Sequence, residues 1–410
     1  MHNSLKDNLK FNSNFLIFFS LISISFGFNY LNYVVLSNFL PQPNFGIFYT
    51  SIVLLNILIT PCVVFNFYIS KIIVNNKEDK KKINIQENFS NLVTLSFCYF
   101  FILQFLFYFL SIYININYQL YFVVSLITLL QCYIEYLRLI LDTGKHYIKS
   151  STYTFFFNLF KLIFCSALVF INVKVSIILL GFLFSQVLII SHFYNQSYLR
   201  FSLRALNLRE ILNFDFFIYF IFFIFMVCFA YADVILSYFL LSNLNDFSNY
   251  SSSNVLPKSI LMFSLPFLKA IYPNLHNQII ALKEVFLLFF SIILISFLIL
   301  LVVYLSYFYF PSILQIKNVD PFILLYSCCS TFCAIMTIFF ILYNLANRNY
   351  KTIFIGFILC FFFMINSFLN TKTYIHEFTN SVLYFYAFSF GVFFILSIIK
   401  LNNFYKKKCR

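Results

Sequence analysis

The chain has 410 residues, of which 62% are hydrophobic and only 10% are charged, and its formal net charge is +14. A soluble domain has about 25% charged residues, so this composition excludes a soluble protein and predicts a polytopic membrane protein. The positive charge does not indicate nucleic-acid binding, because Lys and Arg gather in short loops between apolar runs, where cytoplasmic loops of membrane proteins carry them.

Apolar runs long enough to cross a bilayer recur along the whole chain. A spanning helix needs about 20 apolar residues. On this rule we expect an all-α integral membrane protein with about twelve transmembrane helices, at roughly 15–39, 46–70, 90–112, 119–141, 151–171, 174–193, 213–241, 253–273, 284–310, 321–345, 352–369 and 379–399. Pro61, Pro257 and Pro266 fall within or at the start of spans, so we expect those helices to kink.

The distribution of positive charge predicts the orientation of these helices. With the N-terminus in the cytoplasm, only Lys174, Lys317 and Lys372 fall on the outer side. Lys161 and Lys258 fall deep within spans, and the rest of the 27 Lys and Arg residues are on the cytoplasmic side, including Lys269 near the inner end of its span. This bias places both termini in the cytoplasm.

A short internal repeat divides the predicted helices into two sets of six. Val34–Leu40 (VVLSNFL) matches Val234–Leu240 (VILSYFL), and beyond an insertion Phe45 and Phe48 fall opposite Phe247 and Tyr250. We therefore expect two six-helix halves around a central cavity, at residues 1–200 and 201–410, the second ending in a basic cytoplasmic tail. Such parallel repeats are typical of transporters that bind substrate between their halves.

Charged residues inside the predicted spans are the candidate site. Each costs about 2.5 to 3.5 kcal/mol at a helix centre, so a charge that persists there is a functional candidate. We expect four of them to line a substrate cavity: Lys161, Asp233, Lys258 and Lys269. The alternative for Asp233 and Lys258 is a static salt bridge, and for Lys269 it is snorkelling to the inner headgroups.

Other polar residues in the spans have simpler interpretations. Glu135 and Arg138 are three residues apart and predict an ion pair on a helix surface. The amides of Asn158, Gln186, Asn344 and Asn366 are expected to bridge helices as structural contacts.

The sequence has no catalytic constellation, no Gly-rich phosphate loop and no His, Cys or acidic cluster with metal-ligand spacing. We therefore expect a protein that is not an enzyme and holds no metal or cofactor. An ion gradient is the expected source of energy for transport.

Three segments of the sequence carry a family resemblance. They are LSNFLPQPNFGIFYTSIVLLNILITP, RLILDTGKHYIKSSTYTFFFNLFKLIF, and the stretch from Ala232 to Leu275 that contains Asp233, Tyr250 and Pro273. The chain resembles the Wzx-type O-antigen and capsule flippases of the multidrug/oligosaccharidyl-lipid/polysaccharide exporter superfamily, although Asn249 replaces the family's Gly before the Tyr.

The resemblance implies a flippase of the bacterial inner membrane. Its substrate would be an undecaprenyl-diphosphate-linked oligosaccharide, its surroundings membrane lipids, and its further partners a polysaccharide polymerase and a chain-length regulator. Cationic groups such as Lys161 would bind the diphosphate. Two alternatives stay open: a cation-coupled multidrug exporter of the same superfamily, and a membrane-embedded glycan-processing enzyme.

Overall fold

The computed structural model describes ten continuous ranges of the chain and isolated positions between 261 and 316. The continuous ranges are 2–64, 85–114, 117–143, 147–171, 174–195, 214–241, 243–258, 319–346, 349–369 and 374–408. Within these ranges the regular structure is helical and no strand occurs.

Contacts divide the chain into two compact units. The first comprises Met1–Asn44 and Ser51–Ile224, and the second comprises Phe45–Thr50 and Phe225–Arg410. The predicted boundary at residue 200 lies outside the described residues.

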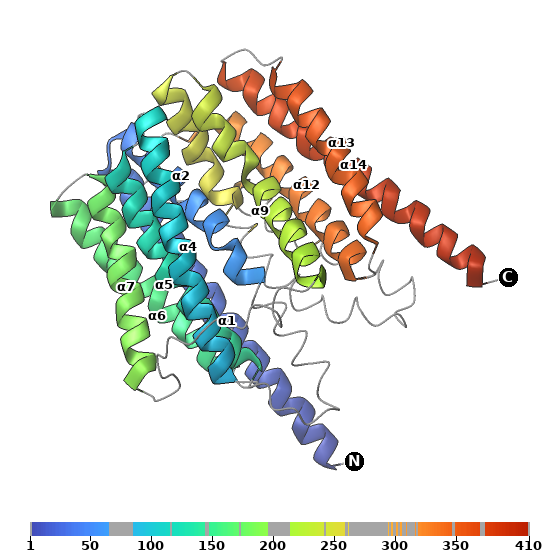
Figure 1. Cartoon of the computed structure of the whole chain (residues 1–410), viewed down its shortest axis with the longest axis horizontal. Coiled ribbons are helices and arrows are strands. Elements are labelled where there is room, and N and C mark those ends of the chain that lie inside the picture. Colours follow the sequence, from blue (N-terminus) through green and yellow to red (C-terminus); the bar gives the residue numbers. More distant parts are fainter. Residues whose placement is uncertain are drawn as a thin grey trace. The chain divides into compact units, whose positions relative to one another are not determined.

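The first unit contains six labelled helices, apart from residues 45–50 of α2, which belong to the second unit (Figure 1). In it α6 packs against α1 and α7, and α5 packs against α4 and α7. These helices are α1 (His2–Phe39), α2 (Gln42–Leu58), α4 (Ile85–Ile114), α5 (Tyr118–Thr143), α6 (Tyr147–Ile171) and α7 (Val175–Asn195).

The second unit contains most of α9, then a helical segment at 244–258, then α12, α13 and α14. In this unit α14 packs against both α12 and α13. The bounds of the four labelled helices are α9 (Phe214–Leu240), α12 (Pro321–Ala346), α13 (Tyr350–Leu369) and α14 (Ile375–Lys408).

The described helices agree with the predicted spans. Eight candidate spans in the described part of the chain are long and apolar enough to cross a membrane. Each predicted span that is described coincides with a helix. Of the predicted 253–273 helix only 253–258 and 261 are described, within a helical segment that already begins at 244, and the 284–310 helix is described only at isolated positions. Large exposed side chains such as Phe101 (66% exposed) and Phe105 (68% exposed) on α4 are suited to contact with lipid.

Proline and aspartate set two of the helix boundaries. Helix α2 ends at Leu58 and a turn at Ile59 separates it from helical residues 60–64, because Pro61 has no backbone N–H to continue the ladder. A break in the helix thus lies beside Pro61, where the sequence predicts a kink. Helix α12 begins at Pro321, and the Asp320 carboxylate caps it by accepting a hydrogen bond of 2.8 Å from the Phe322 N–H.

The two copies of the sequence repeat have the same local structure. Ser37 donates to the Val34 carbonyl over 2.9 Å, and Ser237 donates to the Val234 carbonyl over 2.7 Å. Two residues after each serine, Phe39 and Phe239 are exposed. Phe45, Phe48, Phe247 and Tyr250, which the alignment pairs, are all at most 2% exposed. These matching bonds and burials support a duplicated hairpin.

Candidate functional site

Three charged side chains are buried in the described part of the chain. They are Lys161 in the first unit, and Asp233 and Lys258 in the second. All three belong to the four residues that the sequence predicted as a substrate site. The fourth, Lys269, lies outside the described residues.

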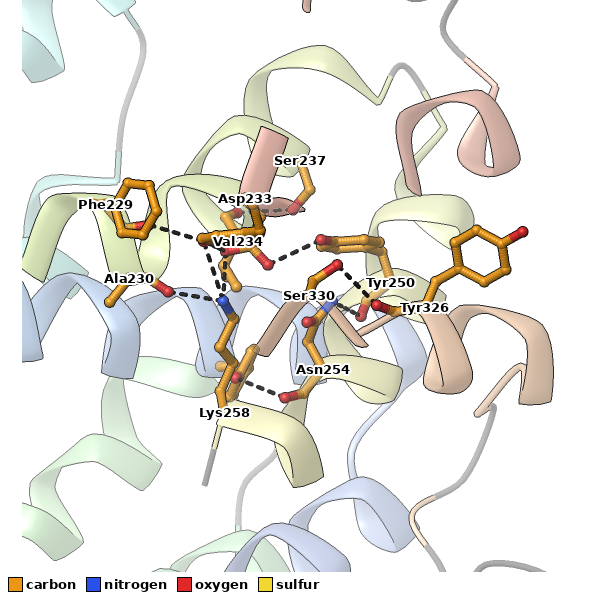
Figure 2. A network of polar contacts seen from close by, with 12 residues as sticks. Phe229, Ala230, Asp233, Val234, Ser237, Tyr250, Asn254, Lys258, Tyr326 and Ser330 are labelled. Atoms are coloured by element: carbon orange, nitrogen blue, oxygen red, sulfur yellow. Dashed lines mark hydrogen bonds and ion pairs between the residues drawn. The ribbon is translucent and has the colours of Figure 1, made fainter. Parts of the chain in front are cut away.

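Asp233 and Lys258 form a buried ion pair in the second unit (Figure 2). The Lys258 Nζ lies 2.8 Å from the Asp233 Oδ1, and the two side chains are 3% and 1% exposed. The Tyr250 hydroxyl donates to the other carboxylate oxygen, Oδ2, over 3.0 Å. The carboxylate therefore has a counter-charge on one oxygen and a hydroxyl donor on the other.

Tyr386 of α14 is the fourth member of this cluster. Its hydroxyl lies 3.0 Å from the Asp233 Oδ1 and 2.8 Å from the Phe229 carbonyl oxygen, and its single proton is donated to one of these two acceptors. The ring of Tyr386 also lies beside the Lys258 ammonium, with the Nζ 4.9 Å from the ring centroid. A cation over an aromatic face is stabilised electrostatically.

The ammonium of Lys258 has an acceptor for each of its three protons. Besides Asp233, it donates to the Ala230 carbonyl over 2.7 Å and to the Tyr386 hydroxyl over 3.4 Å. A lysine offers three donors and no acceptor. Lys258 is therefore fully paired within the protein, as a buried charge must be to avoid a large desolvation cost.

Helical spacing explains why these residues meet. Tyr250, Asn254 and Lys258 are four residues apart, and side chains at that spacing share one face of a helix. Ala230 and Asp233, three residues apart, share a face of α9. The Tyr250–Lys258 face lies against the Asp233 face in Figure 2, and Asn254 donates to the Tyr250 carbonyl over 3.1 Å within its own helix.

Lys161 in the first unit has a different environment. It is 4% exposed on α6, and its ammonium donates to the Asn29 side-chain oxygen on α1. The rings of Phe182 and Phe157 lie beside the Nζ, with centroids 4.8 Å and 5.7 Å away. None of the acids in the described ranges forms an ion pair with this lysine.

Hydrogen bonds between polar side chains link α1 to α6 around Lys161. Four residues before Asn29, Ser25 accepts a hydrogen bond of 2.7 Å from Asn158 and donates to the Thr154 carbonyl over 3.0 Å. Three residues after Asn29, the Asn32 side chain is fully buried, and neither its nitrogen nor its oxygen has a hydrogen-bond partner. Ser25, Asn29 and Asn32 share one face of α1 at helical spacing.

The two buried lysines therefore differ in how their charge is satisfied. Lys258 has a carboxylate, a carbonyl and a hydroxyl as acceptors, whereas Lys161 has one amide oxygen. For Asp233 and Lys258, the structure has the salt bridge that the sequence offered as one alternative. Whether the four charged residues contact a substrate stays a prediction.

Several simpler sequence predictions are confirmed. Glu135 and Arg138 form an ion pair of 2.9 Å on α5. Three of the four amides bridge helices: Asn158 bonds to Ser25, Gln186 bonds to Gln131 over 2.8 Å, and Asn344 bonds to Ser397 over 2.7 Å.

The sequence did not single out Asn29 or Tyr386 as site residues. Neither carries a charge, and each is 132 or more positions along the chain from its charged partner, Lys161 for Asn29 and Asp233 for Tyr386. Their only sequence signal is a polar side chain inside an apolar run, and many Asn and Tyr residues of this chain share it.

Comparisons with known proteins identify the fold. No protein-family model and no curated protein matches the chain. A MATE transporter from Vibrio cholerae matches with a TM-score of 0.62 and 10% identity, covering 96% of both chains. An inward-facing multidrug resistance MATE family transporter of the MOP superfamily matches with a TM-score of 0.67 and 11% identity, covering 95% of this chain and 99% of its own.

A third solved structure extends the likeness to eukaryotes. The eukaryotic MATE transporter AtDTX14 matches with a TM-score of 0.59 and 10% identity, covering 92% of this chain and 94% of its own. The chain thus has the MATE transporter fold, and the predicted all-α membrane protein with about twelve helices in two halves is confirmed.

Proposed function

We propose that this chain is a multi-pass membrane transporter of the MOP superfamily. The observation that carries the proposal is the likeness in fold to MATE transporters over nearly the whole length of the chain and of its neighbours. The buried charges support the same function. An intramembrane lysine without a carboxylate partner is costly in a static bundle, and such residues are typical of substrate and ion pathways.

The comparisons favour a cation-coupled multidrug exporter over the flippase that the sequence resembles. One matching structure is described as a multidrug resistance MATE family transporter, and the others shown above are MATE transporters. Cationic drugs would be bound by carboxylates. However, Asp233, the acid that is buried in the described ranges, already has Lys258 and two tyrosine hydroxyls around it.

The flippase is the second candidate, and Lys161 is the observation that favours it. A buried ammonium that forms no ion pair with the acids of the described ranges suits an anionic substrate, such as the diphosphate of an undecaprenyl-linked oligosaccharide. In that case the protein works in the bacterial inner membrane beside a polysaccharide polymerase and a chain-length regulator. Asp233, Lys258 and Lys269 are the other proposed contacts in the substrate cavity.

One pair of cell assays separates the two substrate classes. The chain is expressed in a drug-sensitive strain and in a strain that lacks its own flippase. A drug exporter raises resistance to cationic dyes such as ethidium and leaves surface glycan absent. A flippase restores surface glycan and leaves dye resistance unchanged. Absence of both effects, with the chain present in the membrane at normal levels, would contradict the proposed function.

A further inference from the structure

Two hydroxyl side chains of α12 are buried without a hydrogen-bond partner in the protein. Ser327 is 2% exposed and Thr331 is 0% exposed, and neither the Ser327 Oγ nor the Thr331 Oγ1 is paired with a protein atom. A buried hydroxyl that has given up its bonds to water is costly unless another group replaces them. These two positions therefore point to a ligand that forms hydrogen bonds.

Other hydroxyls of the same helix are satisfied by the helix itself. Ser330 and Thr337 each donate to the carbonyl four residues earlier, over 2.8 Å in both cases, and Figure 2 shows the Ser330 bond. This carbonyl is a common local partner of a serine or threonine inside a helix. Ser327 and Thr331 do not use it, so their hydroxyl groups are available to bond to a molecule beside the helix.

The two hydroxyls lie together on one side of α12. Ser327 and Thr331 are four residues apart, and side chains at that spacing are neighbours on a helix. The side that packs on α14 is marked by Phe340, whose ring centroid lies 6.4 Å from that of Phe390 and 5.6 Å from that of Phe394. Thr331 is about two and a half turns from Phe340, which places the hydroxyl pair on the opposite side of α12.

The surroundings of the pair favour a small neutral ligand. Leu324 and Ile335, one turn before Ser327 and one turn after Thr331, are both 0% exposed, and α12 carries no charged residue. An ion would therefore meet an apolar helix face there, which makes an ion costly. A water molecule donates and accepts as the hydroxyls do, and internal waters in proteins typically make two to four hydrogen bonds. Side chains one turn apart have Cβ atoms about 5 to 6 Å from each other, so one water oxygen can bond to both hydroxyls.

We propose that Ser327 and Thr331 hold one internal water molecule inside the second unit. The water accepts a hydrogen bond from one hydroxyl and donates one to the other, so both buried groups are satisfied without a side chain from another helix. The site lies within the candidate membrane span Pro321–Leu345. It is independent of the proposed transport function, because it depends only on the local chemistry of α12.

The sign of a stability change tests the proposal. Thermal unfolding of the purified full-length protein in detergent is compared for the wild type, Thr331→Val and the matched control Thr337→Val. Valine keeps the shape of threonine and removes only the hydroxyl. If water satisfies Thr331, Thr331→Val should lower the melting temperature by a few degrees, as loss of the carbonyl bond does in Thr337→Val. A Thr331→Val melting temperature equal to or above that of the wild type would overturn the proposal, because removal of an unsatisfied hydroxyl is neutral or stabilising.

Radiolytic labelling of the same protein detects the water directly. An X-ray pulse produces hydroxyl radicals from water held beside a side chain, and these oxidise that side chain even when it is closed to solvent. Cys328 is the reporter, because it follows Ser327 and is only 5% exposed, and Cys360 on α13, at 3%, is the buried control. We expect oxidation of Cys328, read by residue-resolved mass spectrometry, to fall several-fold in the double variant Ser327→Ala with Thr331→Val while Cys360 does not change. Equal oxidation of Cys328 in the wild type and in the folded double variant would overturn the proposal.

Discussion

Asp233 and Lys258 lie 2.8 Å apart in a site that is nearly closed to solvent, and two tyrosine hydroxyls complete the shell of the carboxylate. The three elements that meet here are α9, the helical segment 244–258 and α14. The ion pair therefore links segments of the second unit that are far apart in the sequence. Its most direct consequence is for the stability of this unit.

Neutralising one member of the ion pair should destabilise the folded protein more than neutralising both members. Asp233→Asn or Lys258→Met leaves an unpaired buried charge, which typically costs about 3 to 5 kcal/mol. The double variant, Asp233→Asn with Lys258→Met, removes both charges and should recover part of that loss. Denaturation of the purified protein in detergent measures the effect. A double variant that loses the sum of the two single losses would contradict the pairing.

The same double variant separates a static pair from a substrate contact. If the pair is structural, the double variant should transport at a rate close to wild type once its membrane level is matched. If either residue binds substrate, transport should fall although the protein remains folded. The surface-glycan and dye-resistance assays provide this readout.

The two tyrosines should contribute to stability through their hydroxyl groups. Tyr250→Phe removes a hydrogen bond to a buried carboxylate, which is typically worth about 1.5 to 3 kcal/mol. Tyr386→Phe should cost a similar amount, because its hydroxyl contacts Asp233, Phe229 and Lys258. Tyr384→Phe on the same helix is the control, since that side chain is 64% exposed. Equal melting temperatures for all three variants would be inconsistent with the cluster.

The contact between α6 and α7 should depend on Gly181. A Cβ atom at this position would come within 2.8 Å of the Cys165 backbone nitrogen and sulfur, so even Gly181→Ala must shift a helix. We expect a loss of about 1 to 3 kcal/mol from this overpacking. Gly27→Ala is the matched control, because its Cβ meets no atom within 4 Å and alanine favours a helix interior by up to about 1 kcal/mol. If both variants melt alike, the close approach of α6 and α7 is wrong.

The orientation predicted from charge can be checked by labelling. Cysteine placed at Lys174 or Lys372 should react with a membrane-impermeant maleimide added to intact cells, because both positions are expected outside. Cysteine placed at Lys351 should react only after the membrane is opened. The experiment needs a background without the ten native cysteines. The reverse pattern would place the termini outside the cytoplasm.

Much of the fold could be predicted because bilayer thickness restricts helix length and charge. The predicted span 119–141 and the observed helix Tyr118–Thr143 differ by two residues or fewer at each end. The start of α1 at His2 was less predictable, since its polar first turns are helical without being apolar enough to indicate a span. Helix length beyond the membrane is not constrained by hydropathy.

The candidate site was predictable in its charges but not in its pairings. Lys161, Asp233 and Lys258 stand out because charge is rare in apolar runs, and the structure buries all three. Their partners Asn29 and Tyr386 come from distant helices, and sequence periodicity does not show which helices pack together. The difference between a paired Lys258 and a Lys161 without an acid therefore required the three-dimensional arrangement.

Transport by the purified protein tests the central claim most directly. The full chain is reconstituted in liposomes with a pH gradient, and translocation of ethidium and of a lipid-linked diphosphate oligosaccharide is followed for the wild type and for Lys161→Met. The account predicts that the wild type moves one of the two probes, and that Lys161→Met, which lacks the cation proposed to bind the diphosphate, moves the lipid-linked probe more slowly than the wild type. Movement of neither probe by folded wild-type protein would contradict the account.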